Sequence, residues 1–420
     1  MKLSTFSKQL WLLTWAITGL LAQAVAEEKD IQKAPVAMPV GPFELAPLLE
    51  IAESYSDNIF QRNALQKDSL ITQIHAGGQL SLERKLDRYL LTYLLQSSQY
   101  HNSPQDDYID HYVGINTHTE FTSRHRLNMD AKYLSSHYMR GYFLGRDILG
   151  SSFQGSEPDQ YQVYGGGLTY QYGQQKAKGN LELKLGVDDF TFDNNRERTV
   201  QQDRTVINVT PGFFLRIMPN TRLLAQIEDI WLNHKDAAST QFDYLKQRFL
   251  TGVTWDYSAK TQGMARIGYL RQDYEDPHIQ DYDGITWDVN ARWLPLTYSR
   301  LNLSISRDVN PSVSGYNLRE SDRFSLGWTH DWTTRLSTKL NGAYESANNS
   351  STQRKDDYLS FGLDLHYGFR RWLGMGVSYN FRQLQSSDRQ FNFDQNVAML
   401  YITGNPRISD EAKAPWASWY

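Results

Sequence analysis

The sequence predicts an all-β chain that folds as a transmembrane, antiparallel, up-and-down β-barrel of about 18 strands. Apolar and polar side chains alternate along most of the chain, which places them on opposite faces of a strand. Short and long links follow one another along the chain, as in an outer-membrane barrel with short periplasmic turns and longer surface loops. The chain also begins with an export signal.

Residues 1–26 have the layout of a secretory signal peptide. Lys2 and Lys8 precede an apolar run that begins at Leu10. The run ends in small residues, the last of which is Ala26. The run is short for a membrane span. We expect residues 27–42, EEKDIQKAPVAMPVGP, to be a flexible periplasmic leader. The chain has no cysteine, so it holds no disulfide and no lipid attached to cysteine.

Residues 43–404 are expected to form the barrel, because period-two alternation recurs throughout them. The expected strands are 45–55, 70–82, 88–97, 107–121, 124–137, 160–172, 180–191, 203–217, 221–232, 243–255, 263–273, 284–294, 299–308, 319–332, 334–345, 356–368, 372–384 and 391–403. Residues 405–420 are expected to be a periplasmic C-terminal tail, since Pro406 and Pro415 argue against another strand.

The links sort into two classes by length. Short ones include ERKLD at 83–87 and FRR at 369–371. Long, polar ones include SDNIFQRNALQKDS at 56–69, YMRGYFLGRDILGSSFQGSEPD at 138–159 and SANNSSTQRKD at 346–356. A soluble sandwich has no reason to place its short links on one rim and its long links on the other.

The segment GITWDVNARW, residues 284–293, illustrates the two faces. Its apolar set is expected to face lipid and consists of Ile285, Trp287, Val289, Ala291 and Trp293. Asp288 and Arg292 are expected to face the lumen, about 13 Å apart along the strand. Each therefore needs a partner on a neighbouring strand or meets a solute.

Aromatic residues near the strand ends suggest girdles at the two membrane interfaces. At the short-turn rim we expect Trp255, Trp293, Trp332, Phe369 and Trp372, and at the long-loop rim Tyr55, Tyr138, Phe190, Trp231 and Tyr344.

Charged side chains are expected to line the lumen, with basic ones in excess. The lumen-lining candidates are Arg126, Asp130, Lys132, Arg222, Glu228, Lys246, Arg248, Asp288, Arg292, Arg300, Arg335 and Lys339, and the same alternation adds Arg216, Arg266, Arg323 and Arg382. Such a lining attracts anions if its charges are free. The alternative is that the charges pair across strands and hold the wall together.

No catalytic, metal or cofactor site is expected. Ser136 and His137 are neighbours at a strand end, and Asp110 precedes His111, but adjacent residues of a strand point to opposite faces, so neither pair makes a nucleophile–base contact by itself. The chain contains no HExxH motif and no phosphate-binding glycine loop.

The first strand ends in ESYSDNIFQR, residues 53–62, and contains Pro47. With the signal peptide, this segment resembles the putative β-barrel porin 2 family, and within it the EpsL-like outer-membrane barrels encoded with exopolysaccharide synthesis clusters. The matching positions are Tyr55, Asp57 and Asn58. We expect Asp57 and Asn58 to shape a turn. The resemblance implies a conduit, or an accessory, for a secreted polysaccharide.

These observations lead to one functional expectation and two alternatives. The first is an outer-membrane channel for export of an exopolysaccharide or capsular polysaccharide in a Gram-negative bacterium. The alternatives are a general diffusion porin, and a surface adhesin or outer-membrane enzyme that uses the long loops, above all residues 139–158. Expected partners are outer-membrane lipid, the barrel assembly machinery, a polysaccharide cargo and a periplasmic partner at the tail. The net charge of −4 gives no reason to expect nucleic acid.

Overall fold

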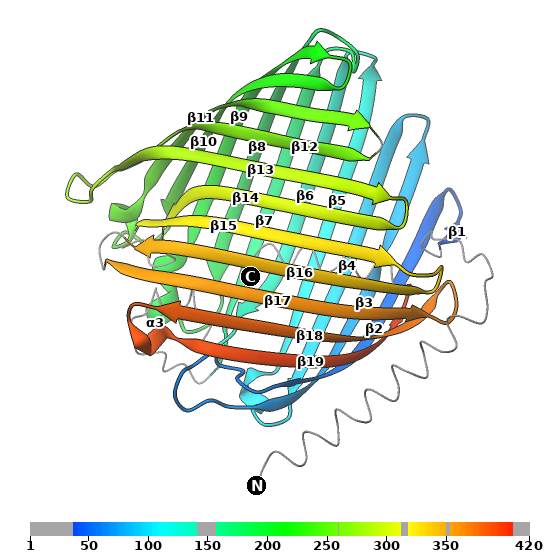
Figure 1. The fold of residues 1–420 in the computed structure, drawn as a ribbon. Coiled ribbons are helices and arrows are strands. Elements are labelled where there is room, and N and C mark those ends of the chain that lie inside the picture. Colours follow the sequence, from blue (N-terminus) through cyan, green and yellow to red (C-terminus); the bar gives the residue numbers. More distant parts are fainter. Residues whose placement is uncertain (1–36, 141–156, 259, 312–317, 350–352, 406–420) are drawn as a thin grey trace.

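The computed structural model describes residues 37–140, 157–258, 260–311, 318–349 and 353–405. They form one antiparallel sheet that closes on itself (Figure 1). Its strands are β1 (Met38–Val40), β2 (Phe43–Ser56), β3 (Ser69–Arg84), β4 (Asp87–Tyr100), β5 (Tyr108–Thr122), β6 (His125–Tyr138), β7 (Asp159–Tyr172), β8 (Gly179–Phe192), β9 (Arg204–Met218), β10 (Thr221–His234), β11 (Tyr244–Ser258), β12 (Thr261–Tyr274), β13 (Tyr282–Leu296), β14 (Ser299–Pro311), β15 (Leu318–Asp331), β16 (Leu336–Asn349), β17 (Arg354–Gly368), β18 (Leu373–Ser386) and β19 (Phe393–Gly404).

Strands β2 to β19 make the barrel wall, and each pairs with the next strand along the chain. The ring closes where β19 pairs with β2, with Val397 opposite Ser56 and Gly404 opposite Leu49. These eighteen strands correspond one to one with the eighteen expected segments, so the predicted fold class is confirmed. The expected signal peptide, residues 1–26, and the expected tail, apart from Asn405, lie outside the described residues.

The end of the expected leader takes part in the sheet. Its last residues form β1, which pairs with the start of β2 so that Met38 lies opposite Leu45. Four short helical turns, η1 (Pro104–Asp106), η2 (Val200–Gln202), η3 (Thr240–Phe242) and η4 (Arg389–Phe391), and the one-turn helix α3 (Arg196–Thr199) lie in the long loops. Among the described residues, no helix has the length and apolar character needed to cross a membrane.

The two rims differ as the link lengths predict. Turns such as 85–86, 123–124 and 219–220 lie at one end of the strands, which we call the short-turn rim. Links such as 57–68 and 193–203 lie at the other end, the long-loop rim. The long link expected at 346–356 is wrong: β16 and β17 continue to Asn349 and Arg354. Polar residues can form strand there because their side chains bond to one another. Asp356 Oδ2 lies 3.1 Å from Asn349 Nδ2 and 2.9 Å from Arg354 Nη2.

The outer face is apolar. Ile285 and Trp293 of β13 are exposed by 63% and 51%, whereas Asp288 between them is buried, so the predicted orientation of this strand is correct. Trp332 and Trp372 are exposed at the short-turn rim, and Tyr344 is exposed at the other. Exposed large apolar side chains around the whole wall suit contact with lipid acyl chains.

The inner face is less polar than alternation predicts. One row of residues that crosses β2 to β8 is apolar and largely buried, except for a glycine on β3. In strand order the row consists of Leu48, Gly77, Leu94, Tyr112, Leu134, Val163 and Phe190, each paired with the next. Val163 is 0% exposed. The girdle positions expected at Tyr138 and Phe190 are therefore wrong, because both rings pack into this inner cluster rather than facing lipid.

Candidate functional site: the barrel lumen

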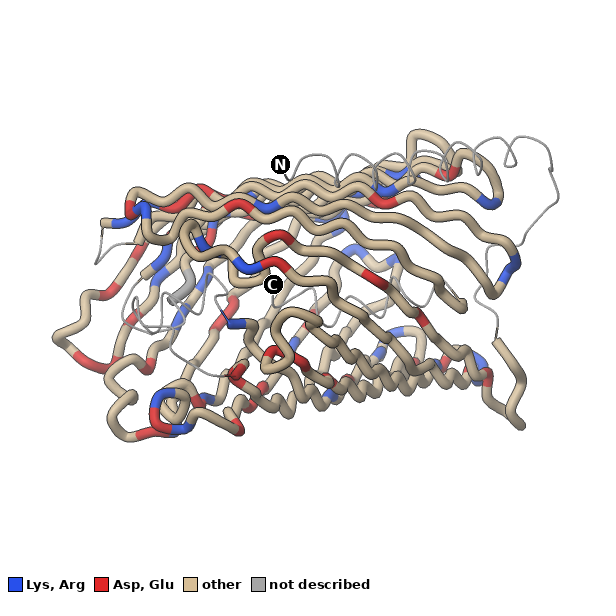
Figure 2. The backbone as a smooth tube through the Cα atoms, turned by 90° about the horizontal axis from the view of Figure 1, so that it is seen from below, with Lys and Arg blue, Asp and Glu red and all other residues tan. Residues whose placement is uncertain are grey.

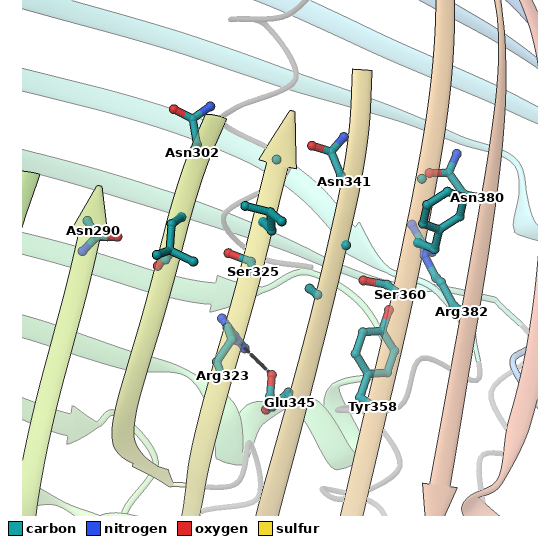
Figure 3. Close-up of a pocket in the computed structure, with 18 of the residues that line it drawn as sticks. Asn290, Asn302, Arg323, Ser325, Asn341, Glu345, Tyr358, Ser360, Asn380 and Arg382 are labelled. Carbon is teal, nitrogen blue, oxygen red and sulfur yellow. Dashed lines mark hydrogen bonds and ion pairs between the residues drawn. The ribbon is translucent and has the colours of Figure 1, made fainter. Parts of the chain in front are cut away.

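A cavity of about 970 Å³ lies inside the barrel against the wall formed by β12 to β18. Alternation and register place two rows of residues on this wall, most of them asparagine, serine or glycine, each row with one arginine at an end. The first row runs Arg292, Asn302, Gly327, Asn341, Gly362 and Asn380. The second runs Asn290, Ser304, Ser325, Ala343, Ser360 and Arg382. Figure 3 shows the amides of Asn302, Asn341 and Asn380 at one level and the hydroxyls of Ser325 and Ser360 at the next.

Glycine makes room for the amides of the first row. A Cβ at Gly327 would lie 3.1 Å from Asn341 Oδ1, and a Cβ at Gly362 would lie 2.9 Å from Asn380 Oδ1. Each asparagine can therefore lie over a bare stretch of backbone on the neighbouring strand. The wall offers neutral donors and acceptors to whatever enters the cavity.

Arginines surround this neutral wall. Arg323 Nη2 lies 2.6 Å from Glu345 Oε2, and Arg319 Nη1 lies 2.7 Å from Glu345 Oε1. Arg292 and Arg382, by contrast, have neither a hydrogen-bonded nor an ion-paired partner within the described part of the chain. The cavity therefore carries two unneutralised cations beside one shared carboxylate.

A lattice of paired charges occupies the neighbouring wall, β10 to β13. Arg248 Nη1 lies 2.8 Å from Glu228 Oε2, and Arg248 Nη2 lies 3.3 Å from Asp288 Oδ2. Arg266 contacts the same two acids, with Nη1 2.5 Å from Glu228 Oε1 and Nη2 3.0 Å from Asp288 Oδ2. The two arginines of β11 and β12 thus lie between carboxylates of β10 and β13. Asp288 finds its partners on β12 and on β11, the next strand but one, whereas Arg292 faces the cavity.

Two more predicted lumen residues form ion pairs across the wall. Lys132 Nζ lies 2.7 Å from Asp188 Oδ1, and Lys246 Nζ lies 2.8 Å from Asp308 Oδ1. Lys246 is buried and also donates to the carbonyl of Val309, at 2.6 Å. The pairing alternative raised from the sequence thus describes this part of the lumen.

The remaining predicted lumen residues lie in several settings. On the inner face, Asp130 is opposite Gly167, Lys339 is opposite Asp364, and Arg300 is exposed opposite Thr329. Arg126 and Arg222 lie near the short-turn rim. Arg335 does not belong to a strand: β16 begins one residue later, so Arg335 lies in the turn 332–335.

Asp110 brings Ser136 and His137 together at the long-loop end of the lumen, which the sequence does not predict. Ser136 Oγ donates to Asp110 Oδ2 at 2.9 Å, and His137 Nδ1 lies 3.0 Å from Asp110 Oδ1. All three side chains are buried. The carboxylate lies between the hydroxyl and the imidazole, whereas nucleophilic catalysis needs the imidazole between the other two. The arrangement supports the loop end of β5 and β6 rather than a reaction.

The motif at residues 53–62 joins the first strand to the last. Asp57 Oδ1 accepts from the backbone N–H of Asn396 at 2.8 Å, and Asp57 Oδ2 accepts from Asn396 Nδ2 at 2.7 Å. Asn58 is fully buried and donates through Nδ2 to the carbonyls of Arg62, at 2.8 Å, and Asp394, at 2.9 Å. Asn58 does shape the turn, as expected, but with Asp57 it also fastens the seam between β2 and β19.

The link 57–68, which begins within the motif, turns toward the lumen. Gln61 lines the cavity and donates to Gln395 Oε1 at 3.2 Å. Arg140 lies over the Phe60 ring at 4.9 Å from its centroid and bonds through Nε to Asp106 Oδ1 at 2.5 Å. Phe60, Asp106 and Arg140, which belong to three different links at the long-loop rim, are thereby in contact with one another.

Tyr55 of the motif has a separate role, since its hydroxyl donates to Asp68 Oδ2 at 3.1 Å on the outer face. Among the described residues, no group of three or more His, Asp or Glu side chains is placed to hold a metal ion.

A family model for "Putative beta-barrel porin 2" matches residues 33–405. The chain belongs to this family. The match covers the whole described barrel, including the motif and the seam, so the family resemblance stated from the sequence is confirmed. The family match does not support the narrower resemblance to EpsL-like proteins. A search of curated proteins finds no match to the chain.

The chain also resembles several solved structures at low sequence identity. OccK2 (OpdF) of Pseudomonas aeruginosa is 12% identical, with 86% of this chain and 97% of that chain covered and a TM-score of 0.45. A BenF-like porin of Pseudomonas fluorescens is 10% identical over 86% of this chain and 98% of that one, with a TM-score of 0.45. The FrpB iron transporter of Neisseria meningitidis is 8% identical with a TM-score of 0.46; the match covers 82% of this chain and 64% of FrpB.

Proposed function

We propose that the barrel is a passive channel through which small hydrophilic solutes diffuse across the outer membrane of a Gram-negative bacterium. The observation that carries this proposal is the cavity of about 970 Å³ lined by asparagine and serine side chains. A wall of amides and hydroxyls replaces part of a solute's hydration without holding the solute by charge. Membership of a porin family agrees with a diffusion channel better than with polysaccharide export.

The same lining supports a weak preference for anions. Arg292, Arg300 and Arg382 face the lumen, and none has an ion-paired partner among the described residues. Free cations in a pore raise the local anion concentration and slow cations. The paired arginines Arg248 and Arg266 do not contribute in this way, because their charges are compensated.

Planar-bilayer recording of the purified barrel tests the channel directly. We expect discrete conductance steps in KCl and a reversal potential, under a KCl gradient, that is shifted toward the chloride equilibrium potential. Swelling of proteoliposomes in sugars of increasing size then gives the size limit. A folded barrel that gives neither conductance nor swelling would contradict the proposal.

Export of an exopolysaccharide or capsular polysaccharide, the role implied by the EpsL-like resemblance, is a second candidate. It is favoured by the rows of amides and hydroxyls, since these groups bond to sugar hydroxyls. Deletion of the gene in a strain that secretes polysaccharide should then reduce the secreted amount. Unchanged secretion, with conductance retained, would reject export and leave the diffusion channel in place.

A further inference from the structure

The short-turn rim is basic. The eight turns that link the strands there contain eight basic residues and, by sequence, no acidic one; the basic residues are Lys85, Arg124, Lys176, Lys178, Lys260, Arg335, Arg370 and Arg371. Figure 2 shows Lys and Arg at several of these turns, on the right, with Asp and Glu on the adjoining strand ends. Anions are therefore attracted to the mouth at the short-turn rim.

Two arginines lie side by side just inside this mouth. Arg216 of β9 and Arg222 of β10 are opposite each other in the sheet. Arg222 donates through Nη2 to the carbonyl of Gln175 at 2.7 Å, and Arg216 donates through its own Nη2 to the same carbonyl. One oxygen shared by two guanidinium groups keeps two positive charges close together.

A third arginine adds to the cluster. Arg126 of β6 is buried and donates through Nε to Gln171 Oε1 at 3.2 Å. Arg126 Nη1 also contacts the carbonyl of Ser123, in the turn 123–124, and this turn is bonded to the turn that holds Gln175, because the Gly173 N–H donates to the carbonyl of Arg124 at 2.8 Å. Arg126, Arg216 and Arg222 therefore form one positively charged group, which we call the arginine cluster.

No carboxylate neutralises the arginine cluster within the described residues: the acceptors that its side chains contact there are the carbonyls of Ser123 and Gln175 and the amide of Gln171. Glu182 is already bonded, with Oε1 3.1 Å from Lys184 Nζ and Oε2 2.8 Å from Gln171 Nε2. Like charges held this close repel, and an oxyanion between them relieves the repulsion and accepts charge-assisted hydrogen bonds. Arg216 Nε, moreover, is buried without a hydrogen-bond partner.

The arginine cluster opens to the channel rather than to lipid. Ile217 and Leu223, the sequence neighbours of Arg216 and Arg222, are exposed on the outer face by 47% and 44%. Alternation therefore turns both arginines inward. We propose that Arg126, Arg216 and Arg222 bind an oxyanion, a phosphate or carboxylate group carried by a solute, at the short-turn mouth of the channel.

Inorganic phosphate is the probe that tests this site. Chloride current through the full mature barrel in neutral phosphatidylcholine bilayers should fall saturably when phosphate is added at the short-turn side. The double variant Arg216→Gln, Arg222→Gln should raise the half-blocking concentration by at least about tenfold, because it removes two charge-assisted donors. The matched control is Arg88→Gln, because alternation also turns Arg88 inward near the same rim but its charge is paired, with Nε 3.6 Å from Glu83 Oε1; this variant should block like the wild type. Equal block in the double variant and the wild type would overturn the proposal.

Direct binding separates this site from the transport proposal. Phosphate titration of the folded barrel in neutral detergent, followed by ³¹P line broadening, requires no conductance. Binding that the double variant loses supports the site even if the barrel does not conduct, whereas conductance with no phosphate binding rejects the site alone. Repeating the block in bilayers that contain phosphatidylglycerol distinguishes the source of the oxyanion: loss of the block there would assign the site to a lipid headgroup and overturn the solute assignment.

Discussion

Asn58 shows how much one polar side chain can contribute to a membrane barrel. It is fully buried, donates two hydrogen bonds and accepts a third from the backbone N–H of Arg62 at 3.1 Å. One of its acceptors, the carbonyl of Asp394, belongs to the last strand. No pattern of hydrophobicity reveals this role, because the partner lies at the other end of the chain. The family motif identifies the position, but only the closed ring explains it.

Replacement of Asn58 by Ala should lower the free energy of unfolding by about 2–3 kcal/mol, since buried carbonyls at the seam lose their donor. The measurement is urea unfolding of the refolded barrel in micelles, followed by tryptophan fluorescence. Asn63→Ala is the matched control: Asn63 is exposed and makes one long bond of 3.4 Å to the carbonyl of Arg389. Equal losses in the two variants would show that the buried bonds of Asn58 do not stabilise the seam.

At the scale of elements, alternation and link length predict the strands well. All eighteen expected segments coincide with strands, and even the orientation of Trp293 and Asp288 on β13 is correct. Alternation does not predict which inward residues meet, because that depends on register between strands. The bonds of Arg248 to Asp288, 40 residues away, and of Arg266 to Gln226 follow from that register.

The charge lattice on β10 to β13 should stabilise the wall that carries it. Arg266→Met should cost about 3–5 kcal/mol of unfolding free energy, because Glu228 and Asp288 are then left in a mostly buried site with Arg248 alone. Arg300→Met is the control, since Arg300 is exposed and unpaired within the described residues, and we expect a change below about 0.5 kcal/mol. Unfolding in urea compares the two. A loss in Arg266→Met no larger than in the control would mean that the lattice adds no net stability.

At the scale of the whole molecule, the lumen is divided. One row of side chains on the inner face of β2 to β8 is apolar and packed together, whereas the polar cavity lies against β12 to β18. Alternation predicts a polar lumen throughout and so misses the packed row. Val163 and Phe190 look in sequence like any other strand residues, and their packing depends on segments that come together only in the ring. The asparagine row is likewise invisible in one strand, because its members come from β14, β16 and β18.

The open side of the lumen can be narrowed by one substitution. Gly327→Leu places a side chain over the cavity wall beside Asn341, and we expect single-channel conductance to fall by roughly half or more, since conductance depends on pore cross-section. Gly342→Leu is the matched control on the next strand. Its position pairs with the exposed residues Leu326 and Phe361, so its side chain enters lipid and the conductance should not change. Equal conductance in the two variants would place the ion path elsewhere.

The seam between β2 and β19 also determines the order in which the molecule can be built. Asn58 and Asp394 are 336 residues apart, whereas every other strand pair of the ring is formed by neighbours in the chain. Hairpins of such neighbours form early because closing a short loop costs little entropy, but the ring cannot close until the last strand has been made. Until then the part of β2 from Leu49 to Ser56 presents an unpaired edge, and such an edge is a template for aggregation. The polar clasp at Asp57 and Asn58 is therefore the final contact of assembly, and it converts a growing open sheet into a ring without an edge.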